Sequence, residues 1–483
     1  MSLSKAIIGE EFIETEQPLQ VHEPATGKVL GEISNLNVDQ IRRAIDVAHA
    51  TLQKLQSLTI AQRSALLRKV ADLIRSDPEP LAVIMSREIG RPLKSSRGEI
   101  QRTAQIFDLA SSDVRAVFSG SFVPLESYEF PPGNEKRIAL LTREPVGVVA
   151  SITPFNFPSS SFAHKVAPAL AVGNTVVHKP SVFAPLVQLK LGEIILKAGF
   201  PPGSVNIVTG NSTMIGNEFV DNPKIALITF TGSERVGLEL ASRATLKGKR
   251  SIMELGGSDA QIVLEDANLE KAADAALIGR FDYAGQFCNS TKRLLVRKEV
   301  AQKFTELIKE RLEKTKVGDP MLLDTTVGPL ISKDAVASMK GFVEDAEKKG
   351  GHIIYQGSAP ENEGYYFPPT LMSVEGNRAR ILSEEVFGPV VPIIEIASDD
   401  EAVEIANSTQ YGLDASIFSK DFSRAYKLAG RIKVGMVMIN DTTRLRWDNL
   451  PFGGPKKSGI GRESVKDSMV EMTESKIIAY NLG

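Results

Sequence analysis

Short runs of β-branched residues alternate with helical patterns between residues 146 and 255, and this alternation constrains the fold more than any other feature. The predicted strands are Gly147–Ile152, Thr175–His178, Val205–Val208, Ile225–Phe230 and Ser251–Leu255. The helices predicted between them are Ala184–Ala198, Met214–Val220 and Glu234–Leu246. Strands separated by helices in this way pair in parallel, and the helices cover the faces of their sheet. We therefore predict an α/β fold built on a parallel sheet.

Two further regions flank this one in the sequence. Ahead of it, apolar residues spaced three and four apart predict helices at Val38–Ser57, Ile60–Ser76 and Ser95–Val117. After it, a second α/β region is predicted, with helices at about Leu269–Tyr283 and Lys298–Lys314 and strands at Arg293–Val296, Val390–Glu395 and Ala415–Phe418. The length of 483 residues agrees with two or three structural units, since a domain averages about 150 residues.

The segment Ser119–Thr142 follows neither pattern. Its apolar stretches, Ser121–Pro124 and Arg137–Leu141, flank the turn-forming residues Pro131–Asn134, which is typical of a hairpin. The C-terminal end also becomes β-like, at Lys476–Tyr480. We interpret this segment as a hairpin-like arm whose apolar face needs a partner.

The composition argues against several classes of protein. The formal net charge is −2 and no block of like charges stands out, so neither a nucleic-acid partner nor binding to an anionic membrane is expected. No uncharged apolar run of about 18 residues predicts a membrane span. The acidic residues 1–20 do not resemble a secretory signal, and one cysteine excludes an internal disulfide and a cysteine-based metal cage. We expect a cytoplasmic protein without a metal site.

A candidate phosphate-binding turn joins a predicted strand to a predicted helix at Phe230–Gly237. The Gly-x-Gly-x-x-Gly pattern of many dinucleotide sites is missing. A helix that begins after Gly232 would present free N–H groups and a positive dipole end, and Ser233 adds a hydroxyl. An ordinary strand–turn–helix connection capped by Ser233 explains the same residues. Both interpretations stay open at this point.

Three more residues are candidates for chemistry. Cys288 lies in a polar, glycine-containing segment that suits an exposed thiol, and a thiol attacks carbonyl carbon well when its pKa is lowered. Glu254 ends an apolar strand, where it could deprotonate a water molecule. Asn156 stands in the stiff segment Pro154–Pro158, where its amide could donate to an oxyanion. The alternatives are a small buried cysteine, a solvated carboxylate and an Asx turn.

Seven motifs in a fixed order bear on this choice. They are Pro154–Pro158, Lys179-Pro180-Ser181, Phe230–Ser233, Glu254–Gly257, Gly285–Cys288, Glu385–Pro389 and Pro451–Gly454. The set resembles the aldehyde dehydrogenase superfamily, and the resemblance runs from about Glu23 to the C-terminus. It implies an aldehyde dehydrogenase-like α/β fold, with a Rossmann-type cofactor domain, an α/β catalytic domain and a β-arm for oligomerisation.

The resemblance also implies a mechanism. Cys288 would attack the aldehyde, and the Asn156 side chain together with the Cys288 backbone N–H would hold the oxyanion. Loss of hydride to a nicotinamide would leave a thioester on the cysteine. Glu254 would then activate the water molecule that releases the acid.

For the cofactor, the resemblance implies contacts from Thr153, Lys179, Ser181, Gly232, Ser233, Leu255, Glu385 and Phe387. Lys179 would lie near the adenosine ribose, Ser233 near the pyrophosphate and Glu385 at the nicotinamide ribose. Strictly NAD-using members often carry a glutamate three residues after the lysine, where this chain has Val182. The missing carboxylate removes repulsion towards a 2′-phosphate. We therefore predict that NADP is accepted and preferred, with NAD as the alternative.

The expected substrate is a small polar aldehyde such as glyceraldehyde or lactaldehyde, because the chain looks closest to lactaldehyde, glyceraldehyde and non-phosphorylating glyceraldehyde-3-phosphate dehydrogenases. The residues implied in substrate contact are Arg102, Phe157, His164, Phe287 and Arg446. Phosphate-binding members carry an arginine just before the cysteine, and Phe287 at that position weakens the case for a phosphorylated substrate. Succinate semialdehyde is a second alternative, because arginines could hold its carboxylate. The plain alternatives are a solvated loop for Arg446 and a structural role for His164.

The family's architecture maps onto the chain as three units. The cofactor-binding domain takes residues 1–118, 138–253 and 435–468, and the catalytic domain takes residues 254–434. The oligomerisation arm takes residues 119–137 and 469–483, and a dimer or a tetramer is expected. The rival functions are a CoA-acylating enzyme, which typically lacks the glutamate found here at 254, a thiol hydrolase, and a catalytically silent binding protein on the same scaffold.

Overall fold

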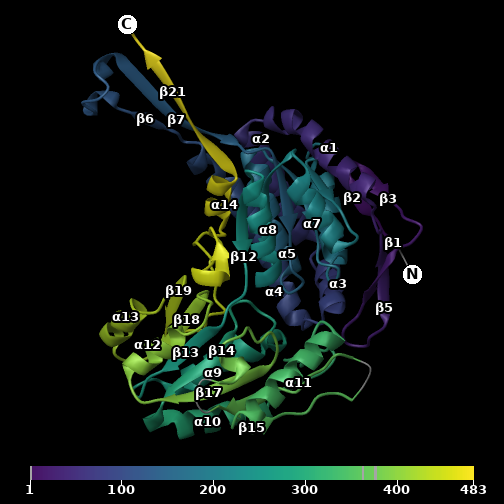
Figure 1. Ribbon diagram of the computed structural model, residues 1–483. Helices are drawn as coiled ribbons and strands as arrows, with labels where there is room; N and C mark the ends of the chain where they lie inside the picture. The colour runs from purple at the N-terminus through teal and green to yellow at the C-terminus, as the bar shows by residue number, and fades with distance from the viewer. Residues whose placement is uncertain (1–2, 362–363, 375–377) are drawn as a thin grey trace.

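The computed structural model describes residues 3–361, 364–374 and 378–483. Two large sheets lie one above the other in Figure 1, with helices around each and a long arm that leaves the body at one side. The α/β fold predicted from the alternating pattern is confirmed.

The first sheet has eight strands, and its five central strands are parallel to one another. In order across the sheet they are β20 (Gly459–Ile460), β12 (Arg250–Glu254), β11 (Ile225–Thr231), β8 (Val148–Ile152), β9 (Thr175–Lys179), β10 (Val205–Ile207), β2 (Ala6–Ile8) and β3 (Glu11–Ile13). Every residue of β8 and β9 is buried. Strands that are covered on both faces need such continuous apolar runs.

Helices cover both faces of this sheet. One layer consists of α1 (Val38–Gln56), α7 (Ser212–Asp221) and α8 (Glu234–Leu246). The other consists of α2 (Ile60–Ser76), α3 (Glu79–Ile89), α4 (Leu93–Val117), α5 (Pro158–Val172), α6 (Leu186–Ala198) and α14 (Val465–Glu471). A small sheet of β1 (Leu3–Ser4), β5 (Val29–Ile33) and β4 (Leu19–His22) lies beside them.

The second sheet has seven strands, of which six are parallel. They are β15 (His352–Gln356), β16 (Thr370–Ser373), β17 (Val390–Ile396), β14 (Thr291–Arg297), β13 (Asp259–Val263), β18 (Asp414–Phe418) and β19 (Met436–Ile439). Its helices are α9 (Leu269–Phe281), α10 (Lys298–Glu313), α11 (Lys333–Lys348), α12 (Asp399–Asn407) and α13 (Phe422–Ala429). Because β19 pairs with β18, this sheet continues past the predicted boundary at residue 434.

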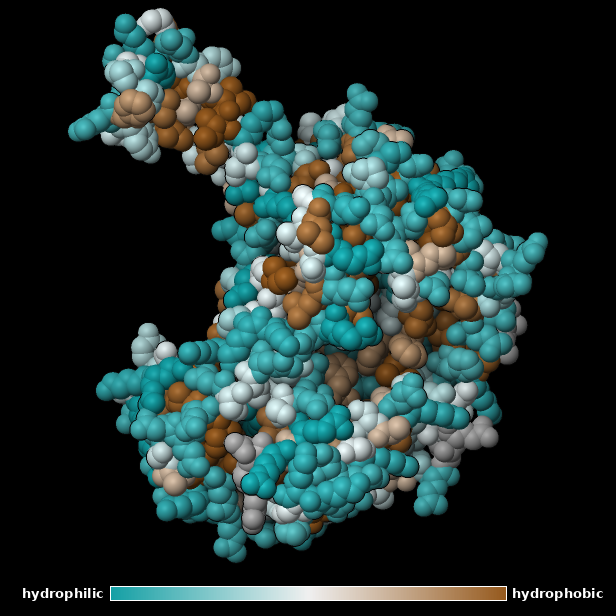
Figure 2. Space-filling view, in the orientation of Figure 1, coloured by the Kyte–Doolittle hydropathy of each residue, from teal (hydrophilic) through white to brown (hydrophobic). Residues whose placement is uncertain are grey.

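The arm is a three-stranded sheet of β6 (Ser121–Val123), β7 (Arg137–Pro145) and β21 (Thr473–Asn481). β7 runs eight residues beyond the predicted end of the arm at 137 and pairs with β21 along its whole length. The arm carries exposed apolar side chains, including Phe122, Phe130 and Ile477. Figure 2 shows a hydrophobic region on the surface of the arm. No helix among the described residues is long and apolar enough to cross a membrane.

Candidate active site

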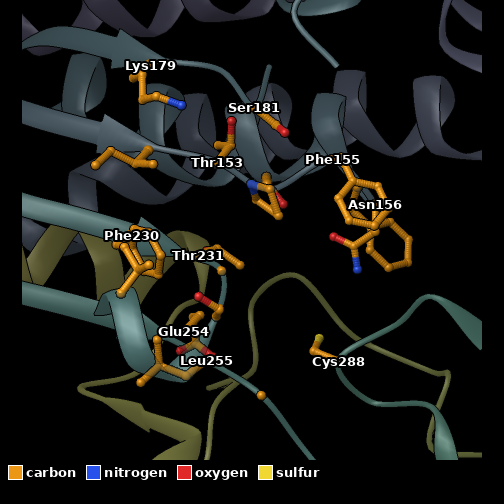
Figure 3. A pocket seen from close by; sticks show the side chains of 18 of the residues that line it. Thr153, Phe155, Asn156, Lys179, Ser181, Phe230, Thr231, Glu254, Leu255 and Cys288 are labelled. Carbon is orange, nitrogen blue, oxygen red and sulfur yellow. The ribbon is translucent and has the colours of Figure 1, made fainter. Parts of the chain in front are cut away.

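One cavity of about 740 Å³ lies where strands β8, β9, β11 and β12 end, beside the loops of the second sheet. Ligands of open α/β sheets bind at this edge, outside the carboxyl ends of the strands. Fifteen of the sixteen residues predicted for catalysis, cofactor and substrate line this cavity, and Phe287 is the exception. Figure 3 shows Cys288 and Asn156 facing the same space from opposite walls, with Glu254 and Lys179 at strand ends.

Cys288 is presented by a tight left-handed turn. Helix α9 ends at Phe281, two residues before the predicted end, because Tyr283, Ala284 and Gly285 have φ angles of 47°, 52° and 69°. A Cβ atom on Gly285 would lie 2.6 Å from the Arg280 carbonyl oxygen, so only glycine fits there. The predicted helix, Leu269–Tyr283, extends to the first residue of this turn.

The Cys288 thiol is half-buried and protonated in this arrangement. Burial raises its pKa to about 12, and the nearby ammonium of Lys292 opposes that rise. Lys292 donates hydrogen bonds to the carbonyl oxygens of Phe287 and Cys288. The pKa of Cys288 is thus raised and not lowered, so the thiol is not ionised in advance. Attack by this sulfur therefore requires a base that removes its proton.

Glu254 is the last residue of β12, and its carboxyl group is buried without a hydrogen-bond partner on either oxygen among the described residues. Burial raises its pKa well above the usual value, and the charge of Glu463 adds to that rise. The carboxyl packs closely on Gly453, where an added Cβ atom would lie 2.5 Å from Oε1. An unpaired carboxyl with a raised pKa is suited to general base chemistry near neutral pH.

Asn156 is held from two sides. Its Nδ2 donates to the carbonyl oxygen of Gln286 over 2.9 Å, which leaves one N–H of the amide free for another acceptor. Its backbone carbonyl accepts from Arg91 over 3.4 Å. Arg91 in turn pairs with buried Glu99, which accepts the backbone N–H groups of Ser159 and Ser160 at the start of α5. This network positions the amide, and sequence reasoning assigned no role to its members.

A buried ion pair beside Glu254 was also missed. Lys165 lies 3.1 Å and Arg446 lies 3.6 Å from the Glu463 carboxylate. Burial opposes ionisation of Glu463, but the two cations outweigh it and lower its pKa to about 2. A signal for this pair was present in the sequence, because a lysine inside the apolar run of α5 needs an anionic partner.

The cofactor end of the cavity carries polar groups that are only partly used. Burial lowers the pKa of Lys179 to about 8, and its Nζ donates to the Pro180 carbonyl oxygen over 3.0 Å. Ser233 caps α8 without a side-chain hydrogen bond. The backbone N–H of Gly232, which precedes α8, donates to the Glu254 carbonyl oxygen over 3.0 Å.

Glu385 and Phe387 reach the cavity from the loop before β17. The Glu385 carboxylate accepts from the Gly257 N–H over 3.1 Å and lies 3.6 Å from Lys292. Burial raises its pKa, and Lys292 opposes that rise. Phe387 packs edge-on against Phe155, with ring centroids 5.9 Å apart.

The substrate end contains three arginines, and each has an acidic partner. Arg102 donates to Asp448, Arg446 lies near Glu463, and Arg444 donates to Asp282 over 3.1 Å. His164 also contacts Asp448, with its Nε2 2.9 Å from Oδ1.

Phe287 differs from the prediction. It is fully buried outside the cavity wall and packs against Phe157 with ring centroids 5.3 Å apart, while Arg444 stacks on it at 3.7 Å. Phe287 therefore lies behind Phe157 and Arg444, which line the cavity, and is not itself part of the cavity wall.

The cavity brings a cysteine thiol, a carboxyl group without a hydrogen-bond partner among the described residues and a partly free amide to the carboxyl ends of a parallel sheet. Residues 12–478 match the Aldehyde dehydrogenase family. The chain is 39% identical over 467 residues to a lactaldehyde dehydrogenase of Methanocaldococcus jannaschii, covering 96% of this chain and 97% of that protein. It is 36% identical to an NADP-dependent glyceraldehyde-3-phosphate dehydrogenase of Streptococcus equinus, covering 99% and 98%.

The structure is similar to the NADP complex of the NADP-dependent glyceraldehyde-3-phosphate dehydrogenase from Bacillus halodurans, with a TM-score of 0.95, 35% identity and full coverage of both chains. This chain belongs to the aldehyde dehydrogenase family. It is an NAD(P)-dependent oxidoreductase that acts on aldehydes, as the sequence motifs predicted.

Proposed function

We propose that this enzyme oxidises a small polar aldehyde, such as glyceraldehyde or lactaldehyde, to its acid through a thioester on Cys288, with NADP as the preferred acceptor. One observation carries the proposal: Cys288, Asn156 and Glu254 come from separate elements and line one cavity with the residues suited to a dinucleotide. A cysteine that merely filled a core would have no reason to share a cavity with an unpaired carboxyl group.

The first step is the attack of Cys288 on the carbonyl carbon. Glu254 accepts the thiol proton. Its raised pKa makes it a stronger base than Glu463, and Glu385 is occupied by the Gly257 N–H and the ammonium of Lys292. The sulfur forms a bond to carbon, and the carbonyl oxygen becomes an oxyanion. The free N–H of the Asn156 amide and the Cys288 backbone N–H donate to that oxygen.

The second step releases the acid. When bound, the nicotinamide ring supplies the hydride acceptor. Cys288 then carries a thioester. Glu254 passes the thiol proton to solvent, removes a proton from the water molecule that attacks the thioester, and afterwards returns this second proton to the leaving sulfur. The carbon–sulfur bond breaks, the acid leaves, and the cysteine regains its proton.

The residues present fit a dinucleotide. The Thr231 hydroxyl is buried without a partner among the described residues, and a Cβ atom on Gly256 would collide with the Glu385 carboxylate. The cavity continues from Cys288 to α7 and α8, where Asn217 and Arg243 line it. Lys179 and Ser181 would hold the adenosine ribose, Ser233 with the α8 N-terminus the pyrophosphate, and Glu385 the nicotinamide ribose.

The NADP preference is supported by the charge beside Lys179. Val182 is 39% exposed at the position where a glutamate would repel a 2′-phosphate, and the ammonium of Lys179 attracts one. NADP-dependent relatives agree with this preference. A comparison of kcat/KM for NADP and NAD tests it, and a large preference for NAD would contradict it.

The proposal of an uncharged substrate is supported by the pairing of the arginines. Arg102, Arg444 and Arg446 all have carboxylate partners, so the substrate end carries little net positive charge. A phosphorylated or carboxylated aldehyde would have to compete with these internal partners. Glyceraldehyde-3-phosphate and succinate semialdehyde remain the second candidates because named relatives act on them.

The partner of the arm is proposed to be a second copy of this chain, in a dimer or tetramer. Exposed apolar side chains on β6, β7 and β21 support this, because a monomer would leave them in water. A cytoplasmic location agrees with a lone catalytic thiol, which a reducing compartment keeps free. Analytical ultracentrifugation of the purified chain measures the oligomeric state.

The proposed mechanism is tested with Cys288→Ser and a panel of aldehydes assayed with both cofactors. The wild type should reduce NADP in the presence of glyceraldehyde or lactaldehyde, and the variant should not. Mass spectrometry of the wild type after rapid quenching should detect the acyl group on Cys288. Aldehyde-dependent cofactor reduction by the serine variant at the wild-type rate would contradict the proposal.

A further inference from the structure

His164 has an unused hydrogen-bonding atom at the substrate end of the cavity. The imidazole lines the cavity from α5, is 1% exposed, and has no partner for Nδ1 among the described residues. Its Nε2 lies 2.9 Å from Asp448 Oδ1, and Asp448 is not part of the cavity wall. Nε2 is therefore bonded to a residue outside the cavity wall, and Nδ1 is the ring nitrogen that is left for a group in the cavity.

The contact with Asp448 fixes the chemistry of the ring. Burial lowers the pKa of His164 to about 4, Arg446 adds to the effect, and the hydrogen bond to Asp448 opposes it. The imidazole is therefore neutral near pH 7, and its one proton lies on Nε2 because a carboxylate only accepts. Nδ1 is left as a lone-pair acceptor.

Arg102 supplies the complementary donor. Its Nε and Nη2 lie 2.9 Å and 2.6 Å from the same Asp448 oxygen. Its Nη1 makes no hydrogen bond to the described residues, and Arg102 lines the same cavity as His164. Asp448 therefore positions two side chains: His164, whose Nδ1 can accept a hydrogen bond, and Arg102, whose Nη1 can donate one to a group that enters the cavity.

A hydroxyl group matches this pair, because it donates one hydrogen bond and accepts others. A carboxylate, phosphate or sulfonate only accepts, so it would meet the lone pair of Nδ1 and the charge of Asp448. A methyl group would leave both polar atoms without partners. The pair therefore discriminates between three chemical classes of substrate.

We propose that His164 and Arg102, both held by Asp448, form a hydroxyl-binding subsite that selects short aldehydes with a hydroxyl group one or two carbons from the aldehyde. The subsite rests on the proposed oxidation at Cys288, since the aldehyde carbon must reach that sulfur. It adds a residue-level reason for the choice among the substrates above.

The test compares 2-hydroxypropanal and 3-hydroxypropanal with propanal, which has the same carbon chain without a hydroxyl. The readout is the ratio of kcat/KM for each hydroxyaldehyde to that for propanal, so any general loss of turnover cancels. The wild type should prefer at least one hydroxyaldehyde by about tenfold or more, since sites built to bind a hydroxyl reject analogues that lack it. In His164→Phe that ratio should fall to about one.

Two matched variants of His164 distinguish binding of the substrate hydroxyl from mere positioning of Asp448. Asn places an acceptor near the position of Nδ1 and loses the contact with Asp448, whereas Gln reaches the position of Nε2 and keeps that contact. We expect His164→Asn to retain most of the hydroxyl preference and His164→Gln to lose it. The reverse order would show that His164 only positions Asp448, and would overturn the subsite.

The two proposals fail in different ways. A wild type that oxidises all three aldehydes with equal kcat/KM would overturn the subsite and leave the aldehyde oxidation standing. A wild type that oxidises none of them, nor any other aldehyde of the panel, would overturn the proposed function. Equal ratios in the wild type and all three variants would likewise overturn the subsite.

Discussion

Glu254 and Glu463 lie beside the same cavity and are both nearly inaccessible to solvent, yet their pKa values shift in opposite directions. Burial disfavours the charged form of both. Glu463 has Lys165 and Arg446 within 4 Å, and their charges more than compensate for the lost solvent. Glu254 has no hydrogen-bond partner within the described parts of the chain. The presence of a paired cation, and not the degree of burial, therefore decides which of these two carboxylates can act as a base.

The comparison separates a carboxylate that stabilises the protein from one that serves the reaction. A paired buried carboxylate contributes to folding, because its removal leaves uncompensated cations. An unpaired buried carboxyl weakens the fold near neutral pH and is retained where chemistry uses it. The following substitutions test this separation, with the largest expected effect first.

Glu254→Gln should lower kcat by a factor of about 10²–10⁴, because the proposed base for the thiol and the hydrolytic water is lost. Stability should not fall at pH 7. The pKa of Glu254 is raised in the folded state, so its contribution to stability is present below the unfolded pKa and decreases as pH rises towards the folded value. Steady-state assays and thermal melting at pH 7 measure the two quantities. Wild-type turnover in this variant would remove Glu254 from the mechanism.

Glu463→Gln makes the same substitution at the paired site and serves as its control. It should cost about 3–5 kcal/mol in the free energy of unfolding at pH 7, because Lys165 and Arg446 lose their buried partner. The pKa of Glu463 is lowered to about 2, so its contribution is present above the unfolded pKa and is lost as pH falls from about 4.5 towards 2. The free energy of unfolding, measured with denaturant, should therefore differ less between the wild type and the variant as the pH falls over that range.

The same variant should also move the pH dependence of turnover. Loss of the Glu463 charge removes a repulsion that raises the pKa of Glu254, and the two freed cations lower that pKa further. The limb of the kcat profile that requires ionised Glu254 should therefore shift to lower pH. An unchanged profile would mean that the two carboxylates do not interact.

Residues that lie at the ends of strands could be predicted from the sequence, and residues that act through long-range pairing could not. Glu254 and Lys179 each lie at the end of a predicted strand, so the pattern alone places them at one edge of the sheet. Glu463 lies in a loop 209 positions after Glu254 in the sequence, and nothing local marks it as the partner of Lys165.

Helix α5 was missed for a related reason. All of its residues from Pro158 to Val172 are buried, so it has no polar face and none of the periodicity by which a surface helix is predicted. Two sheets extend past the predicted boundaries, at β7 and at β19, because strand pairing with distant segments, and not local composition, decides where those strands lie.

Gly453→Ala tests how closely the unpaired carboxyl is packed. Gly453 has a φ angle of 127°, and an added Cβ atom would lie 2.5 Å from Oε1 of Glu254. The strained backbone should cost about 1–3 kcal/mol, and displacement of the carboxyl should reduce kcat by about 100-fold. Gly461→Ala, also at positive φ but with only a methyl of Ile252 at 3.8 Å, is the control and should affect stability alone.

Thr229→Val removes a hydroxyl group that contacts Lys165, the partner of Glu463. Of these substitutions it should have the smallest effect on turnover and stability. The Thr229 hydroxyl accepts a hydrogen bond from Lys165 Nζ over 3.2 Å, whereas the contact of Lys165 with Glu463 does not depend on it. Loss of this bond to a buried cation should cost about 1–3 kcal/mol in the free energy of unfolding. The kcat profile should keep its wild-type pH dependence, because both charges beside Glu463 remain. A shifted profile would mean that the position of Lys165, and not merely its charge, sets the pKa difference between the two carboxylates.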